Sequence, residues 1–457
     1  MARSILVAVE RIKSELARFL APEFIRQVCR SVGHVWRERT LDPVTTIQLF
    51  ALQVLHGNTA CPHAVRLGAV DCTGEAYGQA RQRLPLTVFE RLLSAIREHL
   101  LGSPTLDDGR WHGHRTFLVD GSGVSMPDTK ALQKEYGQPG GQKPGCGFPV
   151  MHLLAMFHAA TGLLLSVVAA PLRTHDMSRI GRLHPDLAPG DVLVGDRAFC
   201  SFAHLALLAA RGVFGLFRVH QRQIVDFRPR RRSASSRSRK SRSRKSRQRR
   251  RPTSRWLKRL GRHDQLVEYV KPQVRPVWMN AEAYADLPEA ITVRELRYTI
   301  AVSGRRTRVV TLATTLLDQT RYPAAEVAAL YGQRWQIETN LRHLKQTLHM
   351  DVLRCKTVEG VNKELAMYAV VYNLVRLVMG EAARRQQVSV ERISFIDAVR
   401  WLAEAVDGPR ELKLRLVPHR PGRLEPRAVK RRPREYDRFN RPRDILRKNP
   451  EGKQLAA

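Results

Sequence analysis

The chain has 457 residues, with 78 Lys or Arg against 42 Asp or Glu, so its net charge is +36 and its isoelectric point is near 11. Its hydrophobic content of 43% is normal for a globular protein and excludes wholesale disorder. No apolar run reaches the roughly 18 residues of a membrane span, and the charged start argues against a secretory signal. Six scattered cysteines without a C-x-x-C pair indicate a reducing cytosol, not a disulfide framework or a zinc module.

Helical periodicity dominates residues 1–104. Apolar residues recur there every three or four positions, most clearly at 44–55 and 86–100. We therefore predict a helical N-terminal domain that ends at the Gly-Ser-Pro sequence of 102–104.

Strand and helix patterns alternate after residue 112, which predicts an α/β fold with a mixed sheet. The first strand, 115–122, ends in Asp-Gly, which is a turn signal, and residues 173–187 are predicted to be helical. The remaining predicted elements are, in order, a hairpin (150–158 and 163–170), a strand (191–196), a helix (202–211), two strands (212–219 and 309–316) and a helical region (324–380). This pattern predicts a core in two parts (112–220 and 306–405), separated by a β-rich insertion (221–305) and followed by a basic tail (406–457).

The positive charge is distributed unevenly. Residues 228–251 contain 14 Lys or Arg and no acid, and we predict that this Arg/Ser block is disordered when free. The stretch from Pro409 has 16 Lys or Arg and six acids, so it contributes a net charge of +10. Of the total of +36, the Arg/Ser block and this stretch together account for +24, and the rest of the chain carries +12. The folded part is therefore itself basic, which indicates a polyanionic partner, most simply nucleic acid. The Arg/Ser block is either a second phosphate-binding segment or a solvated linker.

Three acidic residues occupy positions that suit a catalytic site. Asp120 ends the first strand and Asp196 ends the strand at 191–196, and sites in open α/β sheets collect at the carboxyl ends of strands. Glu338 lies in the later helical region. A triad of carboxylates can hold two Mg²⁺ ions and support displacement at phosphorus, which is the chemistry of phosphodiesters.

The helical region around Glu338 carries three further polar residues of interest. On a continuous α-helix, Tyr331, Arg334, Glu338 and Lys345 fall within an arc of roughly 60°, beside an apolar stripe. In isolation the acid indicates only an intrahelical ion pair. Beside a carboxylate site, however, Arg and Lys are suited to hold phosphates.

These four residues have the spacing Y-x2-R-x3-E-x6-K. With Asp120 in LVDGS and Asp196 in VGDRAF, the chain resembles the DDE transposases of bacterial insertion sequences, in the family with the Tyr-Arg-Glu-Lys signature (the insertion sequence four family), over about residues 1–380. The resemblance implies an RNase H-like catalytic core, with a mixed five-stranded sheet and flanking helices, that a β-rich insertion interrupts before the glutamate. It also implies that the helical N-terminal domain of residues 1–104 binds DNA. The Arg/Ser block is not part of the family pattern.

The resemblance also implies roles. Asp120, Asp196 and Glu338 would be the catalytic residues and would ligate two Mg²⁺ ions, for which Mn²⁺ can substitute. The residues implied to contact the backbone of the transposon end are Tyr331, Arg334, Lys345 and Arg197. Members of the family cut DNA at the ends of the element and join the 3′-hydroxyl to target DNA. They act as homodimers on the DNA. The resemblance thus implies a protein of the bacterial cytoplasm that associates with the nucleoid and not with a membrane.

Other candidates have simpler explanations. Trp335 is expected to be packed or half-buried rather than stacked on a base. His175, Asp176 and Asp128 precede predicted turns or helix starts, and we expect caps there rather than metal ligands. The family uses an aromatic residue of the insertion to hold a flipped base, and here the choice between Trp256, Trp278 and neither stays open.

Two alternatives to an active transposase follow from the same residues. A decayed copy would still bind DNA without cutting it, but the complete triad and signature argue against this. An RNase H-like nuclease would only hydrolyse DNA, but the Tyr-Arg-Glu-Lys helix disfavours it, because strand joining requires a held DNA end.

Overall fold

The computed structural model describes residues 17–102, 104–106, 109–220, 223–229, 252, 254–300, 308–404, 412–418 and 436–448. Its α-helices are α2 (Pro22–Ser31), α3 (Pro43–Leu55), α4 (Cys61–Leu67), α5 (Gly74–Arg83), α6 (Leu86–Gly102), α7 (Lys130–Tyr136), α8 (Phe202–Ala210), α9 (Ala281–Ala285), α10 (Ala324–Gly332), α11 (Trp335–Arg342), α12 (Val358–Arg385), α13 (Phe395–Ala403) and α14 (Arg443–Lys448). Its strands are β1 (Thr116–Ser125), β2 (Val150–His158), β3 (Leu164–Pro171), β4 (Val192–Gly195), β5 (Phe214–Arg218), β6 (Arg255–Gly261), β7 (Asp264–Val270), β8 (Ala290–Ile300) and β9 (Arg308–Thr314). Short 3₁₀ helices are η1 (Ala17–Leu20), η2 (Pro104–Leu106), η3 (Asp176–Ser178), η4 (Ile180–Arg182), η5 (His184–Asp186) and η7 (Val390–Arg392), and η6 (His343–Thr347) is a π-helical turn.

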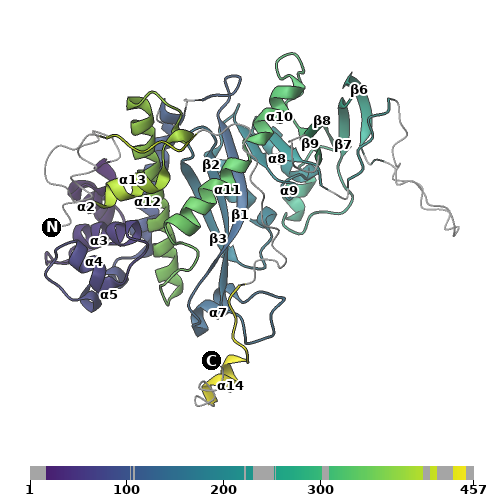
Figure 1. The fold of residues 1–457 in the computed structure, drawn as a ribbon. Helices are drawn as coiled ribbons and strands as arrows, with labels where there is room; N and C mark the ends of the chain where they lie inside the picture. The colour runs from purple at the N-terminus through teal and green to yellow at the C-terminus, as the bar shows by residue number, and fades with distance from the viewer. Residues whose placement is uncertain are drawn as a thin grey trace.

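All nine strands form one mixed sheet, in the order β3-β2-β1-β4-β5-β9-β8-β7-β6 (Figure 1). β1, β2 and β3 are antiparallel, whereas β4 runs parallel to β1 and β5 runs parallel to β4. The predicted sheet of five strands is therefore smaller than the observed sheet of nine. The strands of the predicted insertion extend the same sheet, because β9 pairs with β5 along one edge and with β8 along the other.

β1 continues through the Asp-Gly sequence that had indicated a turn, so that prediction is wrong. Its pairing with β2 is unbroken from Phe117 to Ser125 and includes Asp120 opposite Ala155. Glycine within a strand often marks a close approach by another group. Here a β-carbon on Gly121 would lie 2.6 Å from Oδ1 of Asp176, so the glycine makes room for a carboxylate instead of a turn.

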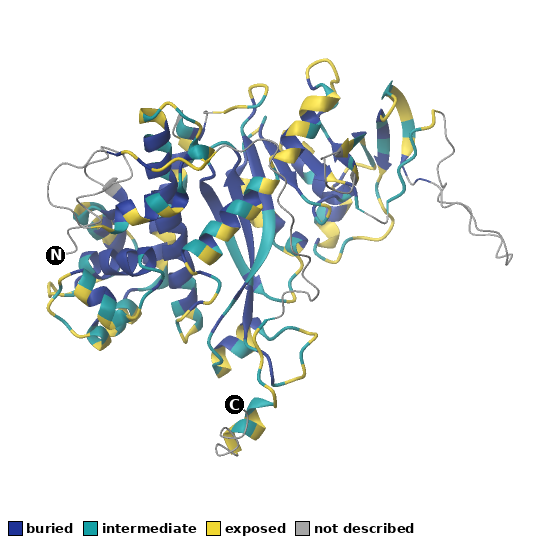
Figure 2. Cartoon of the chain, viewed as in Figure 1, coloured by how far each residue is buried: buried dark blue, intermediate teal, exposed yellow. Residues whose placement is uncertain are grey.

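The helices of the amino-terminal part share a core with the sheet. α2 to α6 lie together with α12 and α13 beside the sheet (Figure 1), and α12 packs against α3, α6, α13 and β3. Among the described helices α12 alone is long and apolar enough to cross a membrane by composition. However, 83% of its most apolar window is buried inside the protein, as the dark colour of Figure 2 shows, so packing accounts for its hydrophobicity.

Two helical predictions are corrected. Residues 173–187 form the successive 3₁₀ helices η3 to η5 instead of one α-helix, with Gly181 and Pro185 interrupting the run. The region 324–380 is broken between α10 and α11, where Arg334 N donates to Tyr331 O at 3.1 Å in a tight turn, and again after η6. Tight and wide turns both change the angle between successive side chains around the helix axis. The predicted arc of roughly 60° for Tyr331, Arg334, Glu338 and Lys345 therefore does not apply.

Two core histidines stack on each other. The rings of His184 and His204 are 5.3 Å apart and nearly parallel, and His204 Nδ1 is 2.8 Å from the Phe199 carbonyl oxygen. Burial lowers the pKa of His204 to about 3 and the pKa of His184 to about 4. Both rings are therefore neutral in the folded protein at neutral pH.

We expect acidification from pH 7 to pH 5 to lower the free energy of unfolding. The unfolded chain takes up protons on these histidines near pH 6.5, whereas the folded chain does not until far lower pH, so stability present above pH 6.5 is lost as the pH falls below it. The loss at pH 5 is at most about 2 kcal/mol per histidine. His204→Asn keeps a donor near the Phe199 carbonyl but cannot be protonated, so urea unfolding should depend less steeply on pH in H204N. Equal pH slopes in H204N and the wild type would contradict this explanation.

Candidate active site

Asp120 and Asp196 lie side by side on neighbouring parallel strands. β1 and β4 pair in register as far as Val119 and Gly195. The residue that follows Val119 is Asp120, and the residue that follows Gly195 is Asp196. β4 ends at this point, whereas β1 continues along β2. The predicted meeting of these two carboxylates is therefore present, at the end of β4 and in the middle of β1.

Hydrogen bonds to the backbone hold both carboxylates. Oδ1 of Asp120 accepts from the Gly121 amide at 2.8 Å, and Oδ1 of Asp196 accepts from the Ala198 amide at 2.7 Å. Each bond leaves lone pairs available on the same carboxylate. The two aspartates are thus oriented without being saturated.

The environment of Asp120 disfavours its charged form. Burial raises its pKa to about 6, and although the Gly121 amide and the Arg334 guanidinium act in the opposite direction, the neighbouring Asp196 and Asp176 carboxylates raise the pKa further. Carboxylates crowded together in a partly dry place repel one another and attract cations. The electrostatics of this position therefore favour a bound positive charge.

Glu338 is joined to the aspartates through Arg334. α11 packs against β1, and the Arg334 guanidinium lies 3.6 Å from Oδ2 of Asp120 and 3.2 Å from Oε1 of Glu338. The Glu338 side chain is 47% exposed, so it borders solvent on the outer side of the guanidinium. One cationic group thus connects the helix carboxylate to the strand carboxylate.

The donor set fits a divalent cation. Within the described ranges no three His, Cys, Asp or Glu side chains come close enough to form a ready metal cluster, and the Arg334 guanidinium lies between Asp120 and Glu338. That guanidinium is itself a cation between two carboxylates. The oxygen donors of Asp120, Asp196 and Glu338 are those that Mg²⁺ and Mn²⁺ prefer, so the space suits such an ion chemically.

The other residues of the signature differ in their surroundings. Lys345, on η6, donates from Nζ to Ser122 Oγ at 3.1 Å and to the Gly123 carbonyl at 2.6 Å, so it is attached to β1 just beyond Asp120. Tyr331 is only 8% exposed, and burial raises the pKa of its hydroxyl. Arg197 follows Asp196 directly and is exposed.

The tryptophans considered as base-stacking residues have mixed exposure. Trp335 is 51% exposed, so the expectation of a packed or half-buried ring is not met, and the Arg334 guanidinium carbon is 5.4 Å from its ring centre. Trp278 packs partly against the main core, and Trp256 is partly buried on β6. Nothing in these positions selects one of the two insertion tryptophans.

Two residues near the site, Asp176 and His152, were not predicted to belong to it. His175 caps η3 as predicted, its Nδ1 accepting from the Met177 amide at 3.2 Å, but Asp176 turns toward β1 and pairs with His152 of β2. Asp176 therefore adds a fourth carboxylate near Asp120. The only available signal was an acid following the predicted hairpin.

The prediction of a cap at Asp128 is also corrected. The side chain of Thr129 caps α7, accepting from the Leu132 amide at 3.3 Å. Asp128 instead forms an ion pair with Arg443 at 2.9 Å, so it binds the carboxyl-terminal segment 436–448.

The segment 436–448 lies against the loop that joins α7 to β2. The Phe439 amide donates to the Cys146 carbonyl at 2.8 Å, and the rings of Phe439 and Phe148 are 4.8 Å apart. The Tyr436 hydroxyl occupies the space beside Gly123 of β1, where a β-carbon would meet it at 2.2 Å. Part of the predicted tail thus docks next to the strand that carries Asp120. Residues 412–418 of that tail are also described, whereas its other residues and the Arg/Ser block beyond residue 229 lie outside the described residues.

Comparison with known proteins places these observations in a family. The family described as Transposase DDE domain matches residues 111–374. Transposase InsG for insertion sequence element IS4 of Escherichia coli (strain K12) is 25% identical over 378 residues, which cover 78% of this chain and 76% of InsG. The putative transposase InsZ of the same organism is 28% identical over 138 residues, which cover 30% of this chain and 46% of InsZ. Among solved structures, a piggyBac transposase synaptic complex with hairpin DNA has a TM-score of 0.41 and 10% identity, over 88% of this chain and 79% of that chain.

The family match spans more than half of the 457 residues and includes all three carboxylates. The two relatives are both transposases, and the longer match is to the transposase of the IS4 element. The chain therefore belongs to the DDE transposases of the IS4 family.

Proposed function

We propose that the chain cleaves DNA at the ends of its insertion sequence and transfers the ends into target DNA. The observation that carries this proposal is that Asp120 and Asp196 occupy adjoining positions after paired parallel strand residues, while the Arg334 guanidinium joins Asp120 to Glu338 on the helix that packs against β1. The family adds the substrate, since InsG is the transposase of an insertion sequence element. The basic balance of the chain suits DNA as the partner.

The catalytic core is proposed to be RNase H-like. The order β3-β2-β1-β4-β5, with an antiparallel meander followed by two parallel strands, supports this assignment. Strands β6 to β8 would then be the insertion before the glutamate, although they extend the sheet instead of forming a separate one. The domain limits predicted from the sequence remain part of the proposal.

The three carboxylates are proposed to hold two Mg²⁺ ions, or Mn²⁺ in their place. Bound ions of this kind activate the attacking oxygen and stabilise the leaving oxygen in displacement at phosphorus. Arg334 lies between the carboxylates of Asp120 and Glu338 and compensates part of their charge. Lys345, fixed to β1, and the exposed Arg197 are placed to hold phosphates of the transposon end. Tyr331 would act on the DNA backbone through Arg334, because it is buried itself.

The remaining parts of the proposal concern assembly and location. A homodimer would bring two transposon ends together, and the work would take place on DNA in the bacterial cytoplasm with the nucleoid. A catalytically inactive DNA-binding protein and a nuclease that only hydrolyses are the alternatives that an assay must separate.

The test is cleavage and joining by purified protein. A supercoiled plasmid that carries the gene with its flanking DNA is incubated with a target plasmid, and products are mapped by sequencing. We expect cuts at the element ends and joined products with Mg²⁺, complete loss with a chelator, and recovery with Mg²⁺ or Mn²⁺. Cuts without joined products would indicate a nuclease, and binding without cuts under all metal conditions would indicate an inactive copy. Either result would contradict the proposal.

A further inference from the structure

A cavity of about 300 Å³ lies beside the helix that carries Glu338. It is enclosed by α11 and the π-helical turn η6, by α12 and the start of α13, and by the turn between β2 and β3. Gln336, Thr339, Asn340 and His343 line it at the three- and four-residue spacing of one helix face. Glu338 is not among the described residues of the lining, so α11 presents its carboxylate on one side and this cavity on another.

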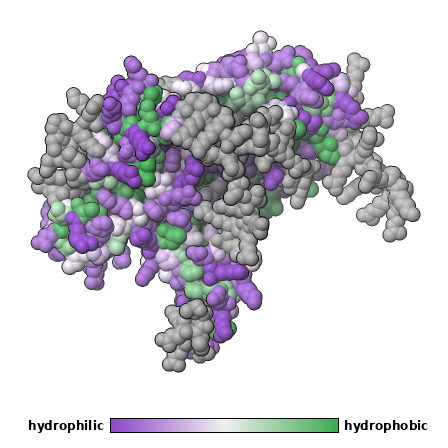
Figure 3. All heavy atoms as spheres, in the orientation of Figure 1, coloured by the Kyte–Doolittle hydropathy of each residue, from purple (hydrophilic) through white to green (hydrophobic). Residues whose placement is uncertain are grey.

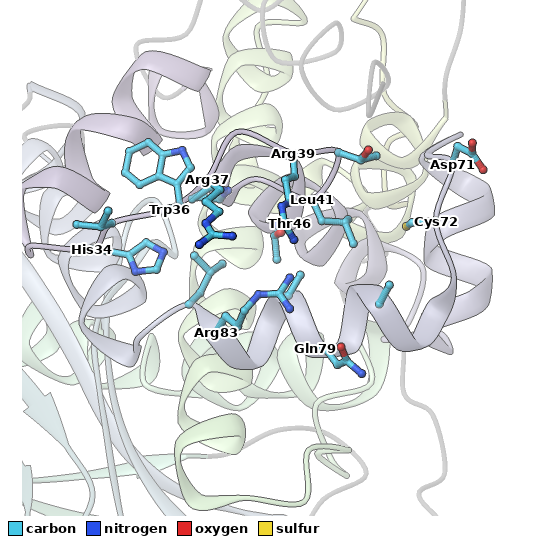
Figure 4. Close-up of a pocket in the computed structure, with 16 residues that line it drawn as sticks. His34, Trp36, Arg37, Arg39, Leu41, Thr46, Asp71, Cys72, Gln79 and Arg83 are labelled. Carbon is cyan, nitrogen blue, oxygen red and sulfur yellow. The ribbon is translucent and has the colours of Figure 1, made fainter.

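This cavity differs in kind from a larger one, of about 740 Å³, in the amino-terminal helices. Figure 4 shows Arg37, Arg39 and Arg83 around the larger cavity, which suits the DNA binding already expected of residues 1–104. The cavity beside α11 instead combines a buried apolar wall with a few polar groups. Sites of that composition, with volumes from about 300 to 1,000 Å³, typically hold small molecules.

The apolar wall and the opening of the cavity are formed by different elements. Met379 of α12, Ile393 and Phe395 of α13 are buried and form the wall. Arg342 and Val417 are exposed lining residues, so the cavity opens to solvent beside them. A ligand that enters there meets charge first and an apolar surface behind it.

Two guanidiniums supply positive charge to the cavity. Arg376 is only 7% exposed, and its Nε and Nη2 both donate to the Thr161 carbonyl, with Nε at 2.9 Å. The guanidinium occupies the space that a side chain on Gly162 would need, so its position is fixed. Its Nη1 has no hydrogen bond, and neither Arg376 nor Arg342 forms an ion pair, within the described part of the chain.

The surroundings of His343 reflect this positive potential. Burial lowers the pKa of His343 to about 3, and the Arg376 and Arg342 guanidiniums act in the same direction. Glu391 is the acid of the lining, and it is exposed and already accepts from the Gln336 side chain. The cavity therefore favours an anion over a cation.

Asn340 adds a buried amide to the two guanidiniums. The residue is 4% exposed, and its side chain forms no hydrogen bond with any residue that the structure describes. Buried side-chain amides nearly always have a partner. One bridging water occupies only about 30 Å³, which is far less than the volume of this cavity. The amide therefore indicates a larger polar partner from outside the chain.

We propose that this cavity binds a small organic anion and that the bound anion restrains α11. Its acidic group, a carboxylate or a phosphate monoester, pairs with Arg342 and Arg376 and accepts from Asn340. Its apolar ring lies on the buried wall. Because the ligand contacts α11 and α12 together, it limits the motion of the helix that carries Glu338. Binding of the anion requires no DNA, so its test is independent of the proposed function.

The probes are 4-fluorobenzoate, 4-fluorophenyl phosphate and the neutral 4-fluorobenzamide, observed by fluorine NMR line broadening with the 457-residue protein. We expect at least one anion to bind with a dissociation constant on the order of 1 mM or lower, as suits a ligand of this size. The neutral amide should bind about tenfold more weakly or less tightly still. The anion that binds more tightly identifies the acidic group. Equal affinities for the amide and the anions, or no binding of either anion, would overturn the inference.

Variants place the binding in the cavity. Arg342→Gln removes an exposed cation, and Asn340→Asp puts a carboxylate of equal size beside the bound acid. Arg66→Gln is the matched control, because Arg66 is exposed on α4 and outside the cavity. Hydrophilic residues predominate on the face of the molecule in Figure 3, so some weak binding of anions to the surface is expected, and R66Q measures it.

We expect affinity to fall about threefold in R342Q and about tenfold in N340D, and to stay at the wild-type value in R66Q. Equal affinities of all three variants for the tighter anion would show binding elsewhere and overturn the inference. Thermal unfolding is compared for each protein. If N340D does not fold, R342Q still decides the outcome, because Arg342 is exposed.

Hydrogen exchange tests the effect on α11. With the tighter anion at saturation, peptides that cover residues 335–345 should exchange more slowly in the wild type and in R66Q. Peptides that cover β6 and β7 serve as the internal reference and should not change. Unchanged exchange of residues 335–345 at saturation would contradict the proposed restraint of the helix.

Discussion

Exchange of any one of the three carboxylates for an amide, as D120N, D196N or E338Q, is expected to abolish DNA cleavage and leave DNA binding intact. The amide oxygen can still accept from the Gly121 or Ala198 amide, so the local backbone is preserved. The charge that would bind the metal is lost, however. Loss of several kcal/mol of transition-state stabilisation corresponds to a decrease in rate of about 10³-fold or more. The rate is measured in single-turnover cleavage of end-containing DNA, and affinity is measured separately.

Asp286→Asn is the matched control for these variants. Asp286 is an exposed aspartate at the end of α9, so the same chemical change is made outside the site. D286N should cleave at the wild-type rate. Normal cleavage by any one of D120N, D196N or E338Q would remove that residue from the catalytic set.

Truncation of Asp264 to alanine should lower the free energy of unfolding by about 3–5 kcal/mol, the cost typical of breaking a buried ion pair. The Arg294 side chain is fully buried, with Nε 2.9 Å and Nη2 2.5 Å from the two Asp264 oxygens. D264A would leave the Arg294 guanidinium without this counter-charge. Its Nη1 would still donate to the Tyr322 carbonyl, which lies at 2.7 Å. The pair joins β7 and β8 to the chain just before α10. Urea unfolding monitored by circular dichroism gives the free energy.

The double variant D264L/R294M tests the cause of that loss. If the penalty comes from an uncompensated buried charge, removal of both charges should be less destabilising than D264A alone. A double variant that is as destabilised as D264A, or more so, would indicate that the lost stability comes from packing and not from the ion pair.

The positions of Asp120 and Asp196 could be predicted because strand patterns are local. The apolar runs before each aspartate indicated β1 and β4, and the parallel pairing of these strands places the residues after Val119 and Gly195 side by side, although β1 continues beyond Asp120. The Asp-Gly turn after Asp120 could not be excluded locally. Its failure depends on Asp176, more than 50 residues away, whose carboxylate fills the space beside Gly121.

The surroundings of Glu338 show the same limit. Its helix was predicted, but the tight turn at Arg334 and the π-helical turn at 343–347 depend on tertiary packing and change which side chains align. The attachment of Lys345 to the Gly123 carbonyl, and of Arg443 to Asp128, joins segments more than 200 residues apart. No periodicity within a single segment predicts such contacts. The extension of the sheet by the insertion is also a contact between distant segments, because β9 pairs with β5 along one edge and with β8 along the other.

α12 joins the amino-terminal helices to the sheet. One side of this helix packs against α3 and α6, and it also contacts β3 of the sheet, with buried side chains such as Met367, Val371 and Val375 along its length. If the amino-terminal helices hold a duplex, this packing would set the span between them and the carboxylates of β1 and β4. The number of base pairs between the contacted backbone and the scissile phosphate would then depend on the fold and not on the DNA sequence.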